Sequence, residues 1–174
     1  MKVLFTGDVS FTGKFSEVSK FESLFSENVN SFFNEHQFIC VNLEGPATNT
    51  EVIFDKAMGV KNPVESVKFL KEKGVTYFNL ANNHTFDCGL DGFNEVKDVV
   101  EGLNAQYFGS GKNIDEASKI VYMLGEGIKV ALLAVGDSGS SSMVASKFKP
   151  GVFSDNHISH IKSKVKEARG SGAD

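Results

Sequence analysis

Apolar and polar positions fall into blocks along this chain, and the blocks predict strands that alternate with helices. Two short, nearly continuous apolar runs, at 2–6 and in "FICVNLE" (38–44), are typical of strands buried on both faces of a sheet. The run "VTYFNLA" (75–81) predicts a third strand, and "AQYFGSG" (105–111) predicts a short fourth. Further on, "KIVYMLGEGIKVALLAV" indicates two strands joined by a turn at 125–127.

Between these runs, apolar residues recur at helical spacing. The pattern predicts helices over about 21–35, 62–74, 90–103 and 155–168. Asn62 is expected to cap the second of these helices, with Pro63 in its first turn and Gly74 at its end. The last helix is expected to direct four apolar residues inward: Ile158, Ile161, Val165 and Ala168.

This order of elements predicts an α/β fold, a layered sandwich in which a mixed, mostly parallel sheet is flanked by helices. The 174 residues are enough for one domain with a substantial core, and no linker divides them. A net charge of −4 gives no reason to expect binding to nucleic acid or to anionic membranes.

The cysteine count and the absence of long apolar runs bear on where the protein works. Two cysteines are too few for a disulfide framework, which fits a reducing compartment. No apolar run reaches the length of a transmembrane helix, so we expect a soluble, cytoplasmic protein without a membrane segment. Cys88 could in principle act as a nucleophile, but a half-buried residue at a helix start is the simpler interpretation.

Polar side chains follow three of the predicted strands. Asp8 follows the first, Asn42 and Glu44 end the second, and 82–84 (Asn-Asn-His) follows the third. In open α/β sheets, ligands collect at the carboxyl ends of the strands. If these strands are neighbours, the side chains converge on one rim as an oxygen and nitrogen ligand set for a divalent cation.

Each of these residues also has an ordinary interpretation. Asp8 follows a glycine in a common type of turn, and Glu44 precedes Gly-Pro as a solvated loop acid would. Asn82 and Asn83 are frequent turn formers, and His84 could be a surface histidine. The hypothesis of a metal site therefore depends on their coincidence at three successive strand ends.

Several strings in this order resemble one known family. "GDVSF", "VNLEGPAT", "LKEKGVTYFNLANNHTFDCGLDGF" and "YFGSGKNIDEA" resemble the CapA family of capsule and poly-γ-glutamate synthesis proteins. The resemblance runs from Val3 to about Asp137, and the Asn-Asn-His-x-x-Asp-x-Gly string after "NLEGP" is its most specific part. It implies a calcineurin-like metallophosphatase fold.

The resemblance assigns roles to matching residues. Asp8, Glu44 and Asn83 correspond to metal-binding positions, with Glu44 as a natural bridge between two ions and Asn42 as its support. His84 would donate a proton to a leaving oxygen, and Asp87 would orient it, unless Asp87 caps the following helix. Related phosphatases usually have a histidine two residues after the first aspartate, a position that this chain fills with serine.

The family's remaining ligands are histidines in later "HWG"-type and "GHxxH"-type motifs, and neither string occurs here. We therefore expect 1–174 to be the N-terminal part of such a domain, truncated before those motifs. His157 and His160 stand three apart on the last helix, but a solvated face is the simpler interpretation. The implied cofactors are one or two divalent metal ions, for which manganese, iron and zinc are the candidates.

Two functions follow from the resemblance. The first is a metal-dependent phosphatase-like or phosphodiesterase-like hydrolase that acts on a phosphate-containing or polyglutamate-related substrate. The second is a non-catalytic accessory subunit of a polymer synthesis or export complex. An unrelated α/β binding domain is a third interpretation. An exposed sheet edge would also favour a homo-oligomer or assembly into a capsule synthesis complex.

Overall fold

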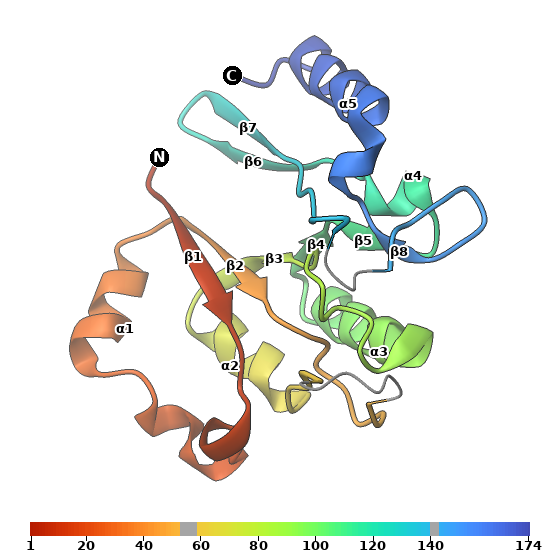
Figure 1. The fold of residues 1–174 in the computed structure, drawn as a ribbon. Coiled ribbons are helices and arrows are strands. Elements are labelled where there is room, and N and C mark those ends of the chain that lie inside the picture. The colour runs from red at the N-terminus through yellow and green to blue at the C-terminus, as the bar shows by residue number, and fades with distance from the viewer. Residues whose placement is uncertain (53–58, 140–142) are drawn as a thin grey trace.

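The centre of the molecule is a four-stranded parallel sheet in the order β1-β2-β3-β4 (Figure 1). The structure is a computed structural model that describes residues 1–52, 59–139 and 143–174. The strands are β1 (Val3–Val9), β2 (Phe38–Leu43), β3 (Val75–Asn79), β4 (Gln106–Phe108), β5 (Ser110–Gly111), β6 (Val121–Gly125), β7 (Ile128–Leu132) and β8 (Gly151–Val152). β6 and β7 form an antiparallel hairpin, and β5 pairs with β8.

Helices join these strands, as the periodicity predicts. The α-helices are α1 (Glu27–Asn34), α2 (Glu65–Glu72), α3 (Gly89–Gly102), α4 (Ile114–Ala117) and α5 (Ile158–Gly170). Short 3-10 helices are η1 (Gly13–Phe15), η2 (Val18–Ser23) and η3 (Asp155–His157). The expected α/β class with a parallel sheet is therefore confirmed.

The continuous apolar run of β2 is explained by burial on both of its faces. Ile39, Val41 and Leu43 belong to the large core that the sheet forms with α2 and α3. Cys40, on the opposite face, packs in a second cluster with Met123 of the β6–β7 hairpin. One face of the sheet is thus covered by helices, and the other is covered in part by the hairpin.

A register shift in β1 lies just before the carboxyl end of this strand. Phe5 pairs with Cys40, but Asp8 pairs with Asn42, so β1 holds one more residue than β2 over this interval. Such a bulge locally turns the strand and redirects its side chains. Asn42 pairs in turn with Asn79 of β3, which places the ends of the three strands side by side.

The helix predicted over 21–35 is wrong as a single element. η2 and α1 replace it, and the break falls just before Ser26, whose hydroxyl accepts a hydrogen bond from the Val29 amide. A serine in this position caps a new helix, and this local bond outweighs the continuous apolar spacing. Phe21 and Phe33 are buried as expected, whereas Phe32 is exposed.

The expected cap at Asn62 is also wrong. α2 begins at Glu65 after Val64, and no side chain caps it. The Asn62 side chain is 1% exposed and bonds to main-chain groups of Phe11 and of the segment that follows β2. The Asn62 side chain bonds to these distant partners instead of to the unpaired amides in the first turn of α2.

The last helix buries less than its pattern suggests. Ile158 and Val165 of α5 are about half exposed, and only Ile161 packs against the small cluster around Phe153. A groove of about 170 Å³ separates α5 from the hairpin, with Val165 and Ala168 on one side and Val130 opposite. The inward orientation predicted for the four residues is thus right for Ile161 and Ala168, which are half-buried. The burial expected of Ile158 and Val165 is wrong. Across the described ranges, no helix is long and apolar enough to cross a membrane.

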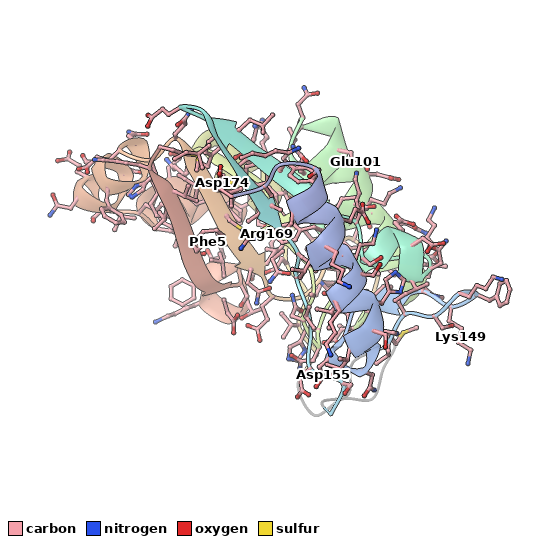
Figure 2. The ribbon with its side chains drawn as sticks, turned by 90° about the horizontal axis from the view of Figure 1, so that it is seen from above. Phe5, Glu101, Lys149, Asp155, Arg169 and Asp174 are labelled. Atoms are coloured by element: carbon pink, nitrogen blue, oxygen red, sulfur yellow. The ribbon has the colours of Figure 1, made fainter. Side chains whose placement is uncertain are left out.

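β1 lies at the edge of the sheet, and one of its apolar side chains is left open. Phe5 faces the hairpin side, since it pairs with Cys40, yet it is 57% exposed. A groove of about 280 Å³ lies there between the sheet and the hairpin segment 131–134. Figure 2, seen from above, labels Phe5 on this strand and Asp174 at the other end of the chain, where Asp174 bonds to Lys129 of β7.

Candidate functional site

An amide network joins the carboxyl ends of the first three strands. The Asn42 side chain donates a hydrogen bond to the carboxylate of Asp8. The Asn82 side chain donates to Asn42 Oδ1 (3.3 Å) and to the carbonyl of Leu43 (2.9 Å). Asp8, Asn42 and Asn82 therefore lie together at the carboxyl edge of the sheet, as the sequence predicts. This edge is called the rim here.

Asn82 also shapes the turn that carries the histidine. Its Oδ1 accepts hydrogen bonds from the main-chain N–H of His84 (3.1 Å) and of Gly45 (3.4 Å). The first bond is the local turn contact that asparagine commonly makes, and the second reaches the segment after β2. Asn82 thus serves as a turn former and as a link between two rim segments, and half-buried Asn83 lies in the same turn.

His84 stands between two acids. Its Nδ1 lies 2.7 Å from Oδ2 of Asp87, and its Nε2 lies 3.7 Å from Oε1 of Glu44. Asp87 is completely buried, whereas the side chains of His84 and Glu44 are 15% and 30% exposed. Because an ionised carboxylate only accepts hydrogen bonds, the Nδ1 atom carries the hydrogen in this contact, and Nε2 faces the rim.

The structure favours one of the two interpretations of Asp87. The residue that precedes α3 is Cys88, whose side chain makes no capping bond. Asp87 Oδ2 instead contacts the His84 ring and accepts a hydrogen bond from the Val60 amide at 2.9 Å. Asp87 is therefore placed to orient His84, and a catalytic role for the pair stays a prediction.

The donors at the rim suit a divalent cation in type. Asp8 is exposed, and Glu44 keeps part of its carboxylate open to solvent. In the part of the chain that the structure describes, no group of three or more His, Cys, Asp or Glu side chains could hold a metal ion. A metal bound here would thus depend on amide oxygens as well, and hard cations accept carboxylate and amide oxygens together.

The other titratable candidates lie outside the rim. His157 stacks on Phe153 with ring centroids 5.5 Å apart, and His160 meets the same ring edge-on. The solvated face predicted for these histidines is thus only partly right. Burial raises the pKa of Cys40 and of Cys88 to about 11, so both remain protonated thiols at neutral pH.

The sequence did not reveal several residues that form hydrogen bonds with the segments of the rim. Asn62 fits a helix-cap pattern, and Val60 carries no chemical signal because it acts through its main chain. Glu95 of α3 binds Thr48 and Asn49 after β2, at a separation of more than 45 residues. None of these contacts has a local pattern in the sequence by which it could be found.

Comparison with solved structures identifies a protein with a similar fold. The structure of Haemophilus influenzae NAD nucleotidase (NadN) matches with a TM-score of 0.51 and 17% sequence identity, over 83% of this chain and 26% of that chain. At this identity the likeness concerns the fold alone. It agrees with the α/β fold that the sequence predicts.

Comparison of sequences gives the family. A family model described as bacterial capsule synthesis protein PGA_cap matches residues 2–174. The capsule biosynthesis protein CapA of Bacillus anthracis is 34% identical over 122 residues, which are 69% of this chain and 30% of that protein. The PGA biosynthesis protein CapA of Bacillus subtilis (strain 168) is 30% identical over 154 residues, which are 85% of this chain and 40% of that protein.

The chain thus spans less than half the length of either relative. The family model nevertheless covers nearly all of it, including the three strand ends that form the rim. The motif strings, the sheet topology and these matches agree, and together they show that this chain belongs to the CapA family of bacterial capsule synthesis proteins.

Proposed function

We propose that the rim is the metal-binding and proton-donating part of a phosphohydrolase-type centre in capsule or poly-γ-glutamate synthesis. The observation that carries the proposal is the His84–Asp87 pair, which stands beside Glu44 at the strand ends where Asp8 also lies. A buried carboxylate behind a histidine is the usual arrangement for a positioned acid or base. The substrate class that fits is a phosphate-containing or polyglutamate-related molecule.

Each rim residue has a distinct part in this proposal. Asp8, Glu44 and Asn83 would hold one or two divalent cations through their oxygens. A bound cation polarises a phosphoryl oxygen and lowers the pKa of bound water. Asp87 contacts Nδ1 of His84 and orients the ring, so that Nε2 is the atom that donates a proton to the leaving oxygen.

A second candidate is a non-catalytic accessory subunit with the same fold. It is favoured by Ser10, which stands where related phosphatases usually have a ligand histidine. Among the described residues, no group of three or more His, Cys, Asp or Glu side chains is arranged so that it could hold a metal ion. In this role the chain works within a capsule synthesis complex or as a homo-oligomer, and the rim serves recognition.

Metal analysis and turnover of the purified chain separate the two candidates. The chain is incubated with Mn²⁺ and desalted, its metal content is measured, and it is then assayed with p-nitrophenyl phosphate and bis-p-nitrophenyl phosphate. We expect stoichiometric Mn²⁺ that is lost in Asp8→Ala, together with slow turnover. His84→Asn should keep the metal and lose about 100-fold in turnover, as expected when a general acid is removed.

The matched controls are His157→Asn and Asp91→Ala, which alter the same residue types away from the rim. Neither should change metal content or turnover. Metal binding without turnover supports the accessory role. Absence of metal from the wild-type chain would contradict the hydrolase proposal.

A further inference from the structure

One short segment behind the rim touches all three strand-end segments that form it. This segment, 60–62, runs along the back of the rim and is called the strap here. Asn62 bonds to the chain after β1 and after β2, and Val60 bonds to Asp87 after β3. The partners lie 14 to 51 residues away from the strap in sequence, so it adds long-range bonds to those that already join the rim segments through Asn82 and the sheet.

Asn62 supplies most of these contacts with a single buried side chain. Its Oδ1 accepts the main-chain N–H of Phe11 at 2.6 Å, three residues beyond Asp8. Its Nδ2 donates to the carbonyls of Glu44 (2.9 Å) and Gly45 (3.1 Å). The side-chain amide therefore fixes the main chain of Glu44 relative to the segment that follows Asp8.

The main chain of Asn62 strengthens the same connection. Its N–H donates to the carbonyl of Pro46 (2.9 Å), and its carbonyl accepts the N–H of Thr48 (3.0 Å). These two bonds make a short parallel bridge between Asn62 and the chain at Ala47. The segment after β2 is thus held to the strap by side-chain and main-chain bonds together.

Val60 provides the contact with the third segment. Its N–H donates to Oδ2 of Asp87, the same oxygen that contacts Nδ1 of His84. Val60 also packs directly against Gly45, where an added Cβ would lie 2.7 Å from the Val60 carbonyl oxygen. Gly45 has φ +79°, so this close approach needs a glycine both for its backbone conformation and for its missing side chain.

We infer that the strap 60–62 is the positioning element of the rim, with Asn62 as the residue that sets Glu44 relative to Asp8 and Val60 as the support of the His84–Asp87 pair. The inference rests on the proposed function insofar as the positioned groups bind a metal and donate a proton. A supporting residue of this kind typically changes metal affinity by about 10- to 100-fold when it is removed.

The test compares Asn62→Ala and Asn62→Asp with the wild-type chain, first without metal. Hydrogen exchange of single amides measures directly how well the strap protects the amides that bond to it. In Asn62→Ala we expect the amide of Phe11 to exchange about ten-fold faster or more, the factor that corresponds to one lost hydrogen bond. The amide of Thr48, which keeps its bond to the main-chain carbonyl of Asn62, should also exchange faster because the strap is held less firmly. Asn62→Asp keeps an acceptor for Phe11 but loses the donor to Glu44, so it should loosen Thr48 more than Phe11.

The control is Val100→Ala, which weakens the core from α3 without touching the strap. It should lower the melting temperature while leaving the relative exchange rates of Phe11 and Thr48 unchanged. Titration with Mn²⁺ then gives the second readout. We expect both Asn62 variants to bind Mn²⁺ about ten-fold more weakly or worse, and Val100→Ala to bind it as the wild type does.

Two results would overturn the inference. One is unchanged protection of Phe11 and Thr48 in Asn62→Ala, and the other is equal loosening by Val100→Ala. If the wild-type chain binds no Mn²⁺, the proposed function fails, while the amide exchange rates still decide whether the strap positions the rim.

Discussion

At the scale of single residues, Asp87 shows how a buried charge is accommodated at this site. Its carboxylate has no exposed surface, yet Oδ2 contacts the His84 ring and the Val60 amide. Burial of a carboxylate without such partners would be strongly unfavourable. The residue therefore stabilises the local structure as well as orienting the histidine, and the two effects have to be separated by experiment.

Replacement of Asp87 by alanine tests its structural contribution. Two donors at the rim, on Val60 and His84, lose an acceptor, and each unsatisfied group costs about 1–3 kcal/mol. We expect the free energy of unfolding to fall by roughly 2–4 kcal/mol, measured by urea denaturation. Asp91→Ala, an exposed aspartate in the first turn of α3, should change it by less than about 0.5 kcal/mol. Equal effects of the two substitutions would contradict this assignment.

At the scale of elements, α3 holds the loop that follows β2. Glu95 accepts hydrogen bonds from the hydroxyl of Thr48, from the Asn49 amide (3.0 Å) and from the Asn49 side chain (2.9 Å). Burial raises the pKa of Glu95, but these hydrogen bonds together outweigh it and hold the pKa below its ordinary value of 4.5. The loop that contains Glu44 is therefore tied to α3 on one side and to the strap on the other.

This arrangement predicts a defined acid dependence. Because the pKa of Glu95 is lower in the folded than in the unfolded chain, its contribution is complete above about pH 4.5 and is lost as the pH falls through the folded value. We expect Glu95→Gln to lower the melting temperature at pH 7, with the difference from wild type shrinking toward pH 3. Glu101→Gln on the same helix, where Glu101 is half exposed and pairs with Lys97 at 3.8 Å, should show no such pH-dependent difference.

The elements also show which parts of the fold and of the site could be predicted from the sequence. The strands and their polar ends could be predicted because apolar runs and terminal polar residues are local signals. The rim could be assembled from them because parallel strands share one carboxyl edge. Asn62 could not be interpreted correctly, since a buried asparagine with partners up to 51 residues away carries the same local pattern as a helix cap. The burial expected of Ile158 and Val165 in α5 was wrong for a related reason: periodicity identifies the apolar face of a helix but not the element that packs against it.

At the scale of the whole molecule, the two faces of the sheet are unequally covered. Helices cover one face, whereas on the other face the β6–β7 hairpin cluster reaches only the start of the edge strand β1, at Val3. Phe5 is left largely exposed beside a groove, although its neighbour Cys40 is buried. An exposed edge strand with an apolar side chain favours pairing with another chain.

Self-association should therefore depend on Phe5. In sedimentation velocity over a range of concentrations, we expect the wild-type chain to associate reversibly. Phe5→Lys should raise the dissociation constant about ten-fold or more, because burial of a phenylalanine ring contributes roughly 1.5–3 kcal/mol. Phe148 is more exposed still, at 85%, but it lies on the turn before Lys149 that projects from the body (Figure 2). Phe148→Lys should thus leave the association unchanged, and a chain that is monomeric at every concentration would rule out an interface at β1.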